Sequence, residues 1–424
     1  MKYALVNGKI LNGHEDMEVL ENHVIYVEDG HIVRISSDVL DGYEKIDLKE
    51  QYIMPGLINM HVHLPSSGKP QKKEVNTTKL VNFVTKYKLT RLVLQKICES
   101  SAKTQLLSGV TTIRTMGGVE NYDAIIRDRI ESGEILGPRV LASNMAVSVP
   151  KGHMAGSLAY EATSAKEAAE YVDKIIEGKP NVIKLMITGG VLDAKKKGEP
   201  GLLKMPAEYV KAACDKAHVH GYQVAAHVES PEGVRVALEN GVDTIEHGAK
   251  PDEKIIQLFK EKGASHIATL SPALPFALSD RNVSHVGEMA QYNGKLVFEG
   301  IIDCAKACLE NNIPVGLGTD TGCPYITHYD MWRELYYFHK YCGVSNRFAL
   351  YTATKRNAEI AGIDDCVGAI DIGKEADMIV TKDNPLNSLE ALRHVSMVIT
   401  KGKVVENPRV KKMKKVEETL DKFL

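Results

Sequence analysis

Two histidines one residue apart, His61 and His63, end the apolar run PGLINMHVHLP at residues 55–65. In a β-strand, side chains at positions i and i+2 lie on the same face, so both imidazoles would point to one side of a buried strand. Burial of two polar rings is costly unless a partner satisfies them. A metal ion is such a partner, and the spacing therefore raises the question of whether the chain supplies further ligands.

The segment from Pro55 onward alternates short apolar stretches with longer helical patterns, which is typical of a parallel sheet. We predict eight strands, within residues 57–63, 110–116, 139–145, 182–188, 223–229, 243–249, 265–271 and 313–320. Eight strand–helix units in roughly 310 residues predict an α/β protein with a (β/α)8 barrel, which we assign to residues 55–367.

The two ends of the chain have a different pattern, with short β segments separated by turn signals. Residues 1–54 contain the pairs Asn7-Gly8 and Asp29-Gly30, which favour hairpin turns, and residues 368–407 return to β patterning. We expect these two regions to form one small β-sandwich beside the barrel. Residues 408–424 are charged and helical in pattern, and we interpret them as a surface or oligomer-contact helix.

Ligand-type or ionisable residues lie at the ends of five of the predicted strands. In (β/α)8 barrels the active site lies at the carboxyl ends of the strands, whereas the interior is filled by branched apolar side chains. Packing alone therefore does not account for these residues, and we predict that they converge on one face and bind metal. They are His61, His63, Lys184, His227, His247 and Asp320.

Imidazole and carboxylate are good ligands for Zn²⁺, and a catalytic zinc keeps one position open for water. A second metal about 3.5–4 Å away would let one hydroxide bridge both ions. Lys184 has two interpretations. Its ammonium could pair with a carboxylate, or desolvation and nearby metal charge could favour the neutral amine. A neutral amine can react with CO2 to give a carbamate, whose two oxygens could bridge two metals.

Two other pairs receive a structural interpretation. His218 and His220 follow a predicted helix and precede the fifth strand, so we place them at the opposite end of the barrel, away from the ligands. Cys304 and Cys308 are four residues apart on a predicted helix, and we interpret them as core packing.

Motifs spread over nearly the whole chain resemble the metal-dependent amidohydrolase superfamily. Among them are MPGLINMHVHL at residues 54–64, GVTTIRTMGG at 109–118, GVDTIEHG at 241–248 and GLGTDTG at 316–322. Within the superfamily, VIKLMITGGV and VDTIEHG resemble the branch that contains imidazolonepropionase-related proteins and the prolidase-like Xaa-Pro and Xaa-Arg dipeptidases.

The resemblance implies a binuclear zinc centre in which a carbamate on Lys184, formed with CO2, bridges the two ions. It further implies that the more buried ion is held by His61, His63 and Asp320, and the other by His227 and His247. Asp320 would also take a proton from the hydroxide that attacks a carbonyl and deliver it to the leaving nitrogen.

Loops on the same face supply four substrate-binding candidates, His153, Glu229, His328 and Tyr329. The dipeptidases commonly carry a tyrosine where Glu229 follows the strand-five histidine. A carboxylate there would repel a free substrate carboxylate and favour a donor-rich group, unless Lys151 neutralises it. The loop after strand three reads KGH rather than the usual GGH, and it keeps His153.

The leading interpretation is a zinc-dependent hydrolase that cleaves an amide-type C–N bond of a dipeptide, an N-acyl amino acid or a cyclic amide. One alternative is a deaminase of a nitrogen heterocycle, although such relatives tend to lack the bridging lysine. Another is a non-catalytic assembly protein that keeps the barrel for binding, although such proteins usually lose several ligands.

The composition excludes other function classes. Lys and Arg total 53 against 55 Asp and Glu, so no basic surface for nucleic acid is indicated. The seven cysteines form no CxxC pair and are interpreted as reduced thiols. No stretch approaches the roughly 18 apolar residues of a membrane span, and the N-terminus lacks a signal-peptide pattern. We expect a cytoplasmic homo-oligomer that binds a small-molecule substrate, and neither nucleic acid nor membrane.

Overall fold

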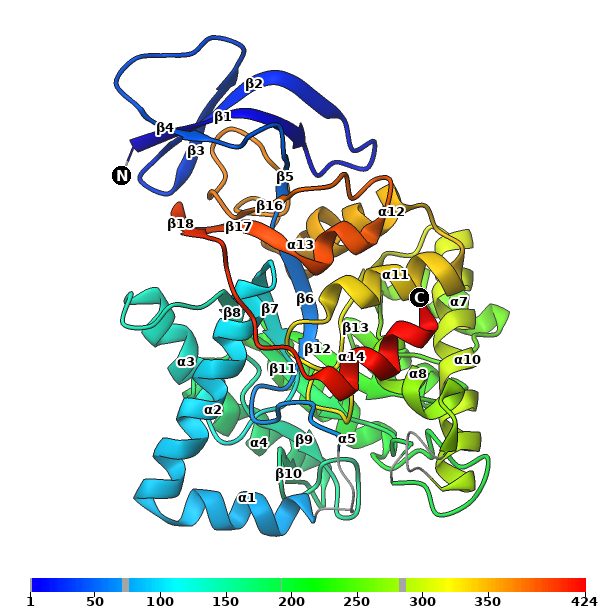
Figure 1. Ribbon diagram of the computed structural model, residues 1–424. Helices are drawn as coiled ribbons and strands as arrows, with labels where there is room; N and C mark the ends of the chain where they lie inside the picture. The colour runs from blue at the N-terminus through cyan, green and yellow to red at the C-terminus, as the bar shows by residue number, and fades with distance from the viewer. Residues whose placement is uncertain (1, 71–75, 192, 282–286) are drawn as a thin grey trace.

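The computed structural model describes residues 2–70, 76–191, 193–281 and 287–424 (Figure 1). Within these residues the strands form three sheets, of eight, seven and three strands. The eight-stranded sheet has the order β18-β17-β16-β5-β1-β2-β3, with β4 paired to β1. Its strands are β1 Lys2–Leu11, β2 Val19–Glu28, β3 His31–Ser36, β4 Glu44–Asp47, β5 Tyr52–Pro55, β16 Met378–Thr381, β17 Val395–Thr400 and β18 Lys403–Glu406.

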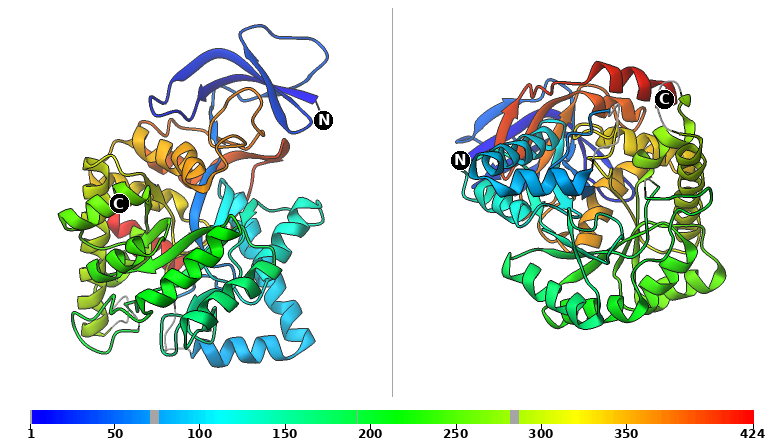
Figure 2. Two further views of the ribbon diagram at one scale, coloured as in Figure 1. Left: turned by 180° about the vertical axis from the view of Figure 1, so that it is seen from behind. Right: turned by 90° about the horizontal axis from the view of Figure 1, so that it is seen from below.

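The eight-stranded sheet joins the two ends of the chain. Strand β5 pairs in parallel with β1 and antiparallel with β16, so that Ile53 lies opposite Val380. Both side chains belong to a buried apolar cluster that also contains Leu5, Ile25 and Ile399. The predicted association of residues 1–54 with residues 368–407 therefore occurs as strands of a single sheet, which lies at one end of the molecule in Figures 1 and 2.

The two predicted turns near the N-terminus have different outcomes. Asp29 and Gly30 join β2 to β3 with φ angles of 46° and 86°, as a two-residue hairpin turn requires. The predicted turn at Asn7-Gly8 is wrong, because the pair lies inside β1 and forms a β-bulge against β2. A Cβ atom on Gly8 would lie 2.5 Å from Leu48 Cδ1, so the absence of a side chain at Gly8 allows Leu48 to pack against the strand.

The other two sheets are parallel, and each of the eight stretches predicted from the sequence contains one of their strands, whereas β9 and β10 lie outside those stretches and were not predicted. The three-stranded sheet contains β6 Leu57–Val62, β7 Val110–Thr115 and β8 Arg139–Leu141. The seven-stranded sheet has the order β10-β9-β11-β12-β13-β14-β15. Its strands are β9 Ala146–Ser148, β10 Ala159–Glu161, β11 Val182–Met186, β12 Gln223–Val228, β13 Thr244–His247, β14 Ser265–Ala268 and β15 Val315–Leu317.

Helices follow most of the parallel strands and cover them. Strands β6, β7 and β11 are buried along their whole length, as expected of parallel strands covered on both faces. The α-helices are α1 Thr77–Lys86, α2 Lys88–Leu107, α3 Tyr122–Glu131, α4 Ala165–Glu177, α5 Ala207–Val219, α6 Pro231–Glu239, α7 Glu253–Lys262, α8 Leu270–Leu278, α10 Glu288–Glu310, α11 Met331–Cys342, α12 Asn346–Tyr351, α13 Asn357–Ala361 and α14 Lys414–Leu420. In the part of the chain that the structure describes, no helix is long and apolar enough to cross a membrane.

The C-terminal tail packs against the loop that follows β15. Val416 and Leu420 of α14 share an apolar cluster with Tyr325 and Ile326. The hydroxyl of Tyr329 accepts a hydrogen bond from the backbone N–H of Met413 at 2.7 Å. The tail thereby supports a loop that begins at the end of a central strand.

Candidate active site

The carboxyl ends of the parallel strands bring the predicted ligands together. The Nε2 atoms of His61 and His63 lie 3.5 and 3.1 Å from Oδ1 of Asp320, which follows β15. The ring of His247, at the end of β13, has its centroid 5.0 Å from that of His61 and 4.6 Å from that of His227. Four histidines and one carboxylate therefore share one region, although they come from four different strands.

The hydrogen bonds of three of these histidines decide which nitrogen faces the centre of the group. Nδ1 of His63 donates to the carbonyl oxygen of Gly117, and Nδ1 of His61 donates to the carboxylate of Glu246, both at 2.8 Å. Since carbonyl and carboxylate oxygens can only accept, Nδ1 carries the proton in both rings. Nδ1 of His247 is engaged by the Thr269 hydroxyl at 2.7 Å, and because a hydroxyl can donate or accept, this contact leaves Nε2 free without fixing its proton. The Nε2 lone pairs of His61 and His63 are thus left for another partner.

The side chains that meet here are suited to bind divalent cations. Burial lowers the pKa of His61 to about 4, so its Nε2 faces the Asp320 carboxylate as a lone pair, and two acceptors then confront each other. In addition, Lys184 Nζ and His227 Nε2 are buried with no hydrogen-bond partner among the described residues. Unpaired buried polar atoms are costly. A set of imidazoles and a carboxylate is the donor set of a catalytic zinc site, and cations there would satisfy these atoms.

Lys184 lies in the middle of β11 and is fully buried. Burial lowers the pKa of its ammonium to about 8, although Glu246 and Asp320 act in the opposite direction. An amine with this pKa is mostly charged but partly neutral near neutral pH, and only the neutral form is a nucleophile.

A buried ion pair behind His61 is part of the site that our sequence analysis missed. Glu246 Oε1 accepts from Arg114 Nη2 at 2.7 Å, while its Oε2 faces His61. Thr244 Oγ1 adds a 2.8 Å bond to the same carboxylate. Burial raises the pKa of Glu246, but Arg114 and His61 outweigh it and hold that pKa well below its usual range. The signal was present, since an arginine and a glutamate stand within predicted buried strands.

Two ligand positions have strained backbones. His247 and Asp320 have φ angles of 69° and 53°, in the left-handed region that non-glycine residues rarely adopt. Asp320 is held by its N–H bond to the carbonyl of His61 at 2.9 Å, and the next residue accepts from the N–H of His63 at 3.0 Å. Such strain is typical of functional sites, where the surrounding contacts must enforce it.

Two of the four substrate-binding candidates lie beside the ligands. The ring of His153 stacks on His227 with a centroid distance of 4.1 Å, and its Nδ1 is 2.5 Å from Asp193 Oδ2. Glu229 is close enough to Asp320 and Asp193 to interact electrostatically with both. Burial, followed by these two carboxylates, raises the pKa of Glu229 well above its usual value. Its Oε2 has no hydrogen-bond partner among the described residues.

The other two candidates are engaged by the protein framework. Nε2 of His328 donates to the carbonyl oxygen of Ser66 at 2.7 Å, and its Nδ1 faces the Gln105 side chain at 3.3 Å. The Tyr329 hydroxyl is occupied by the C-terminal tail. Both residues tie the loop after β15 to its surroundings, and their contact with substrate stays a prediction. Cys323 in the same loop was missed, and its Sγ lies 3.6 Å from Asp320 Oδ2.

The second His-x-His pair lies away from the ligands. His218 is at the end of α5, and its Nε2 is 2.9 Å from Asp243, the residue just before β13. His220 is half exposed. Because His247 ends β13, the pair lies at the opposite end of that strand, as predicted.

The chain is similar to known proteins over most of its length. Residues 52–405 match the model of the amidohydrolase family. An ochratoxinase of Aspergillus niger is 24% identical over 439 residues, which cover 93% of this chain and 85% of that protein. An imidazolonepropionase of Geobacillus kaustophilus is 23% identical, and the match covers 92% of this chain and 92% of that protein.

Two solved structures are similar over nearly the whole chain. The crystal structure of a candidate prolidase from Bifidobacterium longum is 35% identical, with a TM-score of 0.87 and coverage of 99% of this chain and 98% of that one. A Xaa-Pro dipeptidase with bound methionine in its active site is 26% identical, with a TM-score of 0.83 and coverage of 96% and 100%. The branch that the motifs predicted is thereby confirmed.

Proposed function

Because the chain belongs to the amidohydrolase family, we propose that it is a binuclear zinc hydrolase that cleaves an amide-type C–N bond in a small molecule. One observation carries the proposal: His61 and His63 direct Nε2 at a single Asp320 oxygen, while Lys184 Nζ lies buried with no hydrogen-bond partner in the part of the chain that the structure describes. The names of the prolidase-like relatives support a dipeptide or another peptide-like amide as substrate. The lysine argues against the heterocycle deaminase.

In this proposal His61, His63 and Asp320 hold one zinc ion and His227 and His247 hold the other. Such ions would polarise the carbonyl of the scissile bond and lower the pKa of the attacking water. The chain itself fixes the ligands: Glu246 and the Gly117 carbonyl keep protons on Nδ1 of the two strand β6 histidines.

Asp320 is suited to move the proton because its two oxygens have different surroundings. Oδ1 faces the histidine nitrogens, whereas Oδ2 has the weak Cys323 thiol as its neighbour at 3.6 Å. We assign Oδ2 the proton of the attacking water and its delivery to the leaving nitrogen. The left-handed backbone of Asp320 and its bond to His61 hold the carboxylate in place for both tasks.

Lys184 is proposed to react with CO2. The Nζ lone pair forms a bond to the carbon, one C=O π pair moves onto oxygen, and one proton passes from the nitrogen to water, so that the product is a carbamate whose single negative charge is shared by two oxygens. The burial of Nζ supports this assignment, because an anion there would balance the charge of bound cations. It would also replace a buried amine that has no hydrogen-bond partner among the described residues.

Substrate recognition is assigned to His153 and Glu229. Glu229 stands close to Asp193 and Asp320, so this side of the site is rich in carboxyl groups. Such surroundings favour an amine, a guanidine or a ring N–H over a free carboxylate.

We also propose that the two parallel sheets are parts of one (β/α)8 barrel over residues 55–367. Backbone bonds at both seams support closure. Val182 and Asn181, at the start of β11, donate to the carbonyl of Ala142 after β8, and the loop after β15 bonds to β6. Residues 1–54 and 368–407 are then a composite β domain, and 408–424 a tail. A cytoplasmic homo-oligomer stays a prediction.

A combined metal analysis and turnover screen tests the function. Xaa-Pro and Xaa-Arg dipeptides, N-acyl amino acids, lactams and amino-heterocycles are offered to the zinc-reconstituted protein. We expect two zinc ions per chain and hydrolysis of an amide that the Asp320→Asn variant does not hydrolyse at a comparable rate. One metal or fewer after reconstitution, or release of ammonia from a heterocycle as the main activity, would overturn the proposal.

A further inference from the structure

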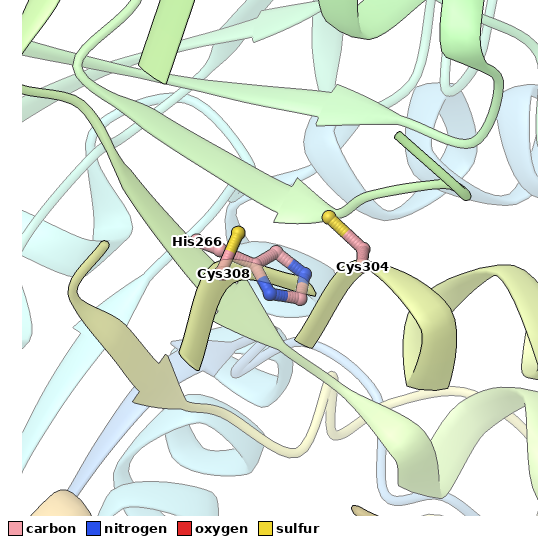
Figure 3. A group of neighbouring side chains, drawn as sticks. All are labelled: His266, Cys304 and Cys308. Carbon is pink, nitrogen blue, oxygen red and sulfur yellow. The ribbon is translucent and has the colours of Figure 1, made fainter. Parts of the chain in front are cut away.

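A second group of metal-ligand side chains lies behind the active site, between β14 and α10. His266 comes from β14, and Cys304 and Cys308 come from successive turns of α10 (Figure 3). All three are fully buried. Each offers a ligand atom, and these atoms lie within 4.8 Å of one another. The two cysteines were interpreted as core packing, but packing does not need an imidazole beside them.

The imidazole of His266 is only partly satisfied by the protein. Its Nε2 donates to the carbonyl oxygen of His247 at 2.7 Å. Its Nδ1 is buried with no hydrogen-bond partner among the described residues. The neighbouring Gly248 allows a close approach, because a Cβ there would clash with both groups, at 2.8 Å from His266 Nε2 and 2.9 Å from Cys304 Sγ. Its φ of 81° also excludes most side chains, so the glycine lets the imidazole and the Cys304 thiol both pack against its backbone.

Two thiolates and one imidazole are the donors of a thiophilic cation. They suit d10 ions such as Zn²⁺ and Cd²⁺, whereas Mg²⁺ and Ca²⁺ prefer oxygen. Binding would release the two S–H protons, and two thiolates would neutralise one divalent ion. A neutral complex is the form that a fully buried space tolerates.

We propose that His266, Cys304 and Cys308 form a site for one thiophilic divalent cation, separate from the active-site metals. The site lies one hydrogen bond behind His247, because His266 supports the carbonyl of that residue. Occupancy would therefore act on the position of a proposed zinc ligand through its backbone.

The test uses Cd²⁺ as the probe, supplied to the full chain during expression so that it can enter before the core closes. Metal analysis counts the ions, and ultraviolet thiolate-to-cadmium absorption and ¹¹³Cd NMR report sulfur coordination. We expect one sulfur-bound Cd²⁺ per chain, which both Cys304→Ser and Cys308→Ala abolish. Cys308→Ala keeps an apolar side chain, so it remains informative if the serine variant does not fold.

Two control variants locate the signal. Cys214→Ser changes an equally buried thiol on α5, and Cys323→Ser changes the thiol beside Asp320. Both should keep the sulfur-bound Cd²⁺. The proposal is overturned if wild type shows no sulfur coordination, if the signal survives Cys308→Ala, or if Cys323→Ser removes it. Because sulfur coordination is read separately from the total metal content, failure of this site leaves the active-site zinc count as an independent result.

Discussion

Glu246→Gln removes the charge that joins His61 to Arg114 but keeps the size of the side chain. The carboxylate accepts from three donors, His61 Nδ1, Arg114 Nη2 and Thr244 Oγ1. A glutamine has one oxygen and one NH2 group. Its NH2 group would therefore face one of these donors, and no hydrogen bond could form there. If the NH2 group faces His61, the imidazole has to accept at Nδ1 and carry its proton on Nε2, where the zinc ligand atom should be.

The expected magnitudes follow from burial. Arg114 is 1% exposed and Glu246 is fully buried, so the variant leaves a buried guanidinium without its counter-charge. Breaking a buried ion pair in this way costs about 3–5 kcal/mol of unfolding free energy. For 424 residues, at an unfolding entropy of about 2.1 cal/mol/K per residue, that loss lowers Tm by about 3–6 °C. Loss of the carboxylate partner of a ligating histidine should weaken zinc binding by about 10–100-fold.

Two assays separate these effects. Urea unfolding of the chelated protein measures stability, and competition with a chelator measures zinc affinity. The matched control is the double variant Arg114→Met/Glu246→Leu, in which no buried charge is left. It should regain most of the stability but not the zinc affinity, because His61 still lacks its acceptor. If Glu246→Gln stays within about 1 kcal/mol of wild type and binds zinc equally well, the reasoning is refuted.

Four further predictions follow from the site and its surroundings. Lys184→Ala should lose metal and activity, with turnover partly restored by short carboxylic acids; an unmodified lysine in the fully metallated enzyme would exclude the carbamate. Asp320→Asn should keep most of its metal while kcat falls by roughly 10²–10⁴, and a kcat near that of wild type would exclude the proton transfer. Glu229→Tyr should shift turnover from substrates with a donor-rich group toward those with a free carboxylate, and an unchanged preference would exclude Glu229 as a specificity residue. Burial raises the pKa of Glu334 to about 7 from 4.5. The stability that its protonation contributes, about 3 kcal/mol, is therefore complete below pH 4.5 and is lost as the pH rises through 7. Glu334→Gln should flatten the decline of Tm over this range, and identical pH profiles would contradict the assignment.

The proposed ligands could be predicted because the signals that mark them are local. His61 and His63 stand at the end of an apolar strand whose two-residue period places both rings on one face. His227 and His247 stand at the ends of strands bounded by turn signals, so their common edge follows from strand direction alone. In each case a few neighbouring residues decide where the side chain lies, and the structure brings these four rings together.

The features that were missed depend on contacts between distant residues. Asn7-Gly8 carries the same turn signal as Asp29-Gly30, but the packing of Leu48 against Gly8 makes it a bulge. The C-terminal tail engages Tyr329, and Ser66 and Gln105 hold His328, so the position of each depends on residues far away in the sequence. The register of α10 on β14, which brings Cys304 to His266, is likewise decided by helix–strand packing and not by either segment alone.

The pairing of β5 with β16 also constrains how the protein can be made. A ribosome releases β5 roughly 320 residues before β16, an interval of some tens of seconds at about 5–20 residues per second. During that time one edge of β5 has no partner strand, and the apolar side chain of Ile53 lacks part of its final cover. Unpaired strand edges are templates for aggregation. Chains interrupted before Met378 should therefore aggregate through this edge, even though every proposed metal ligand has already been synthesised.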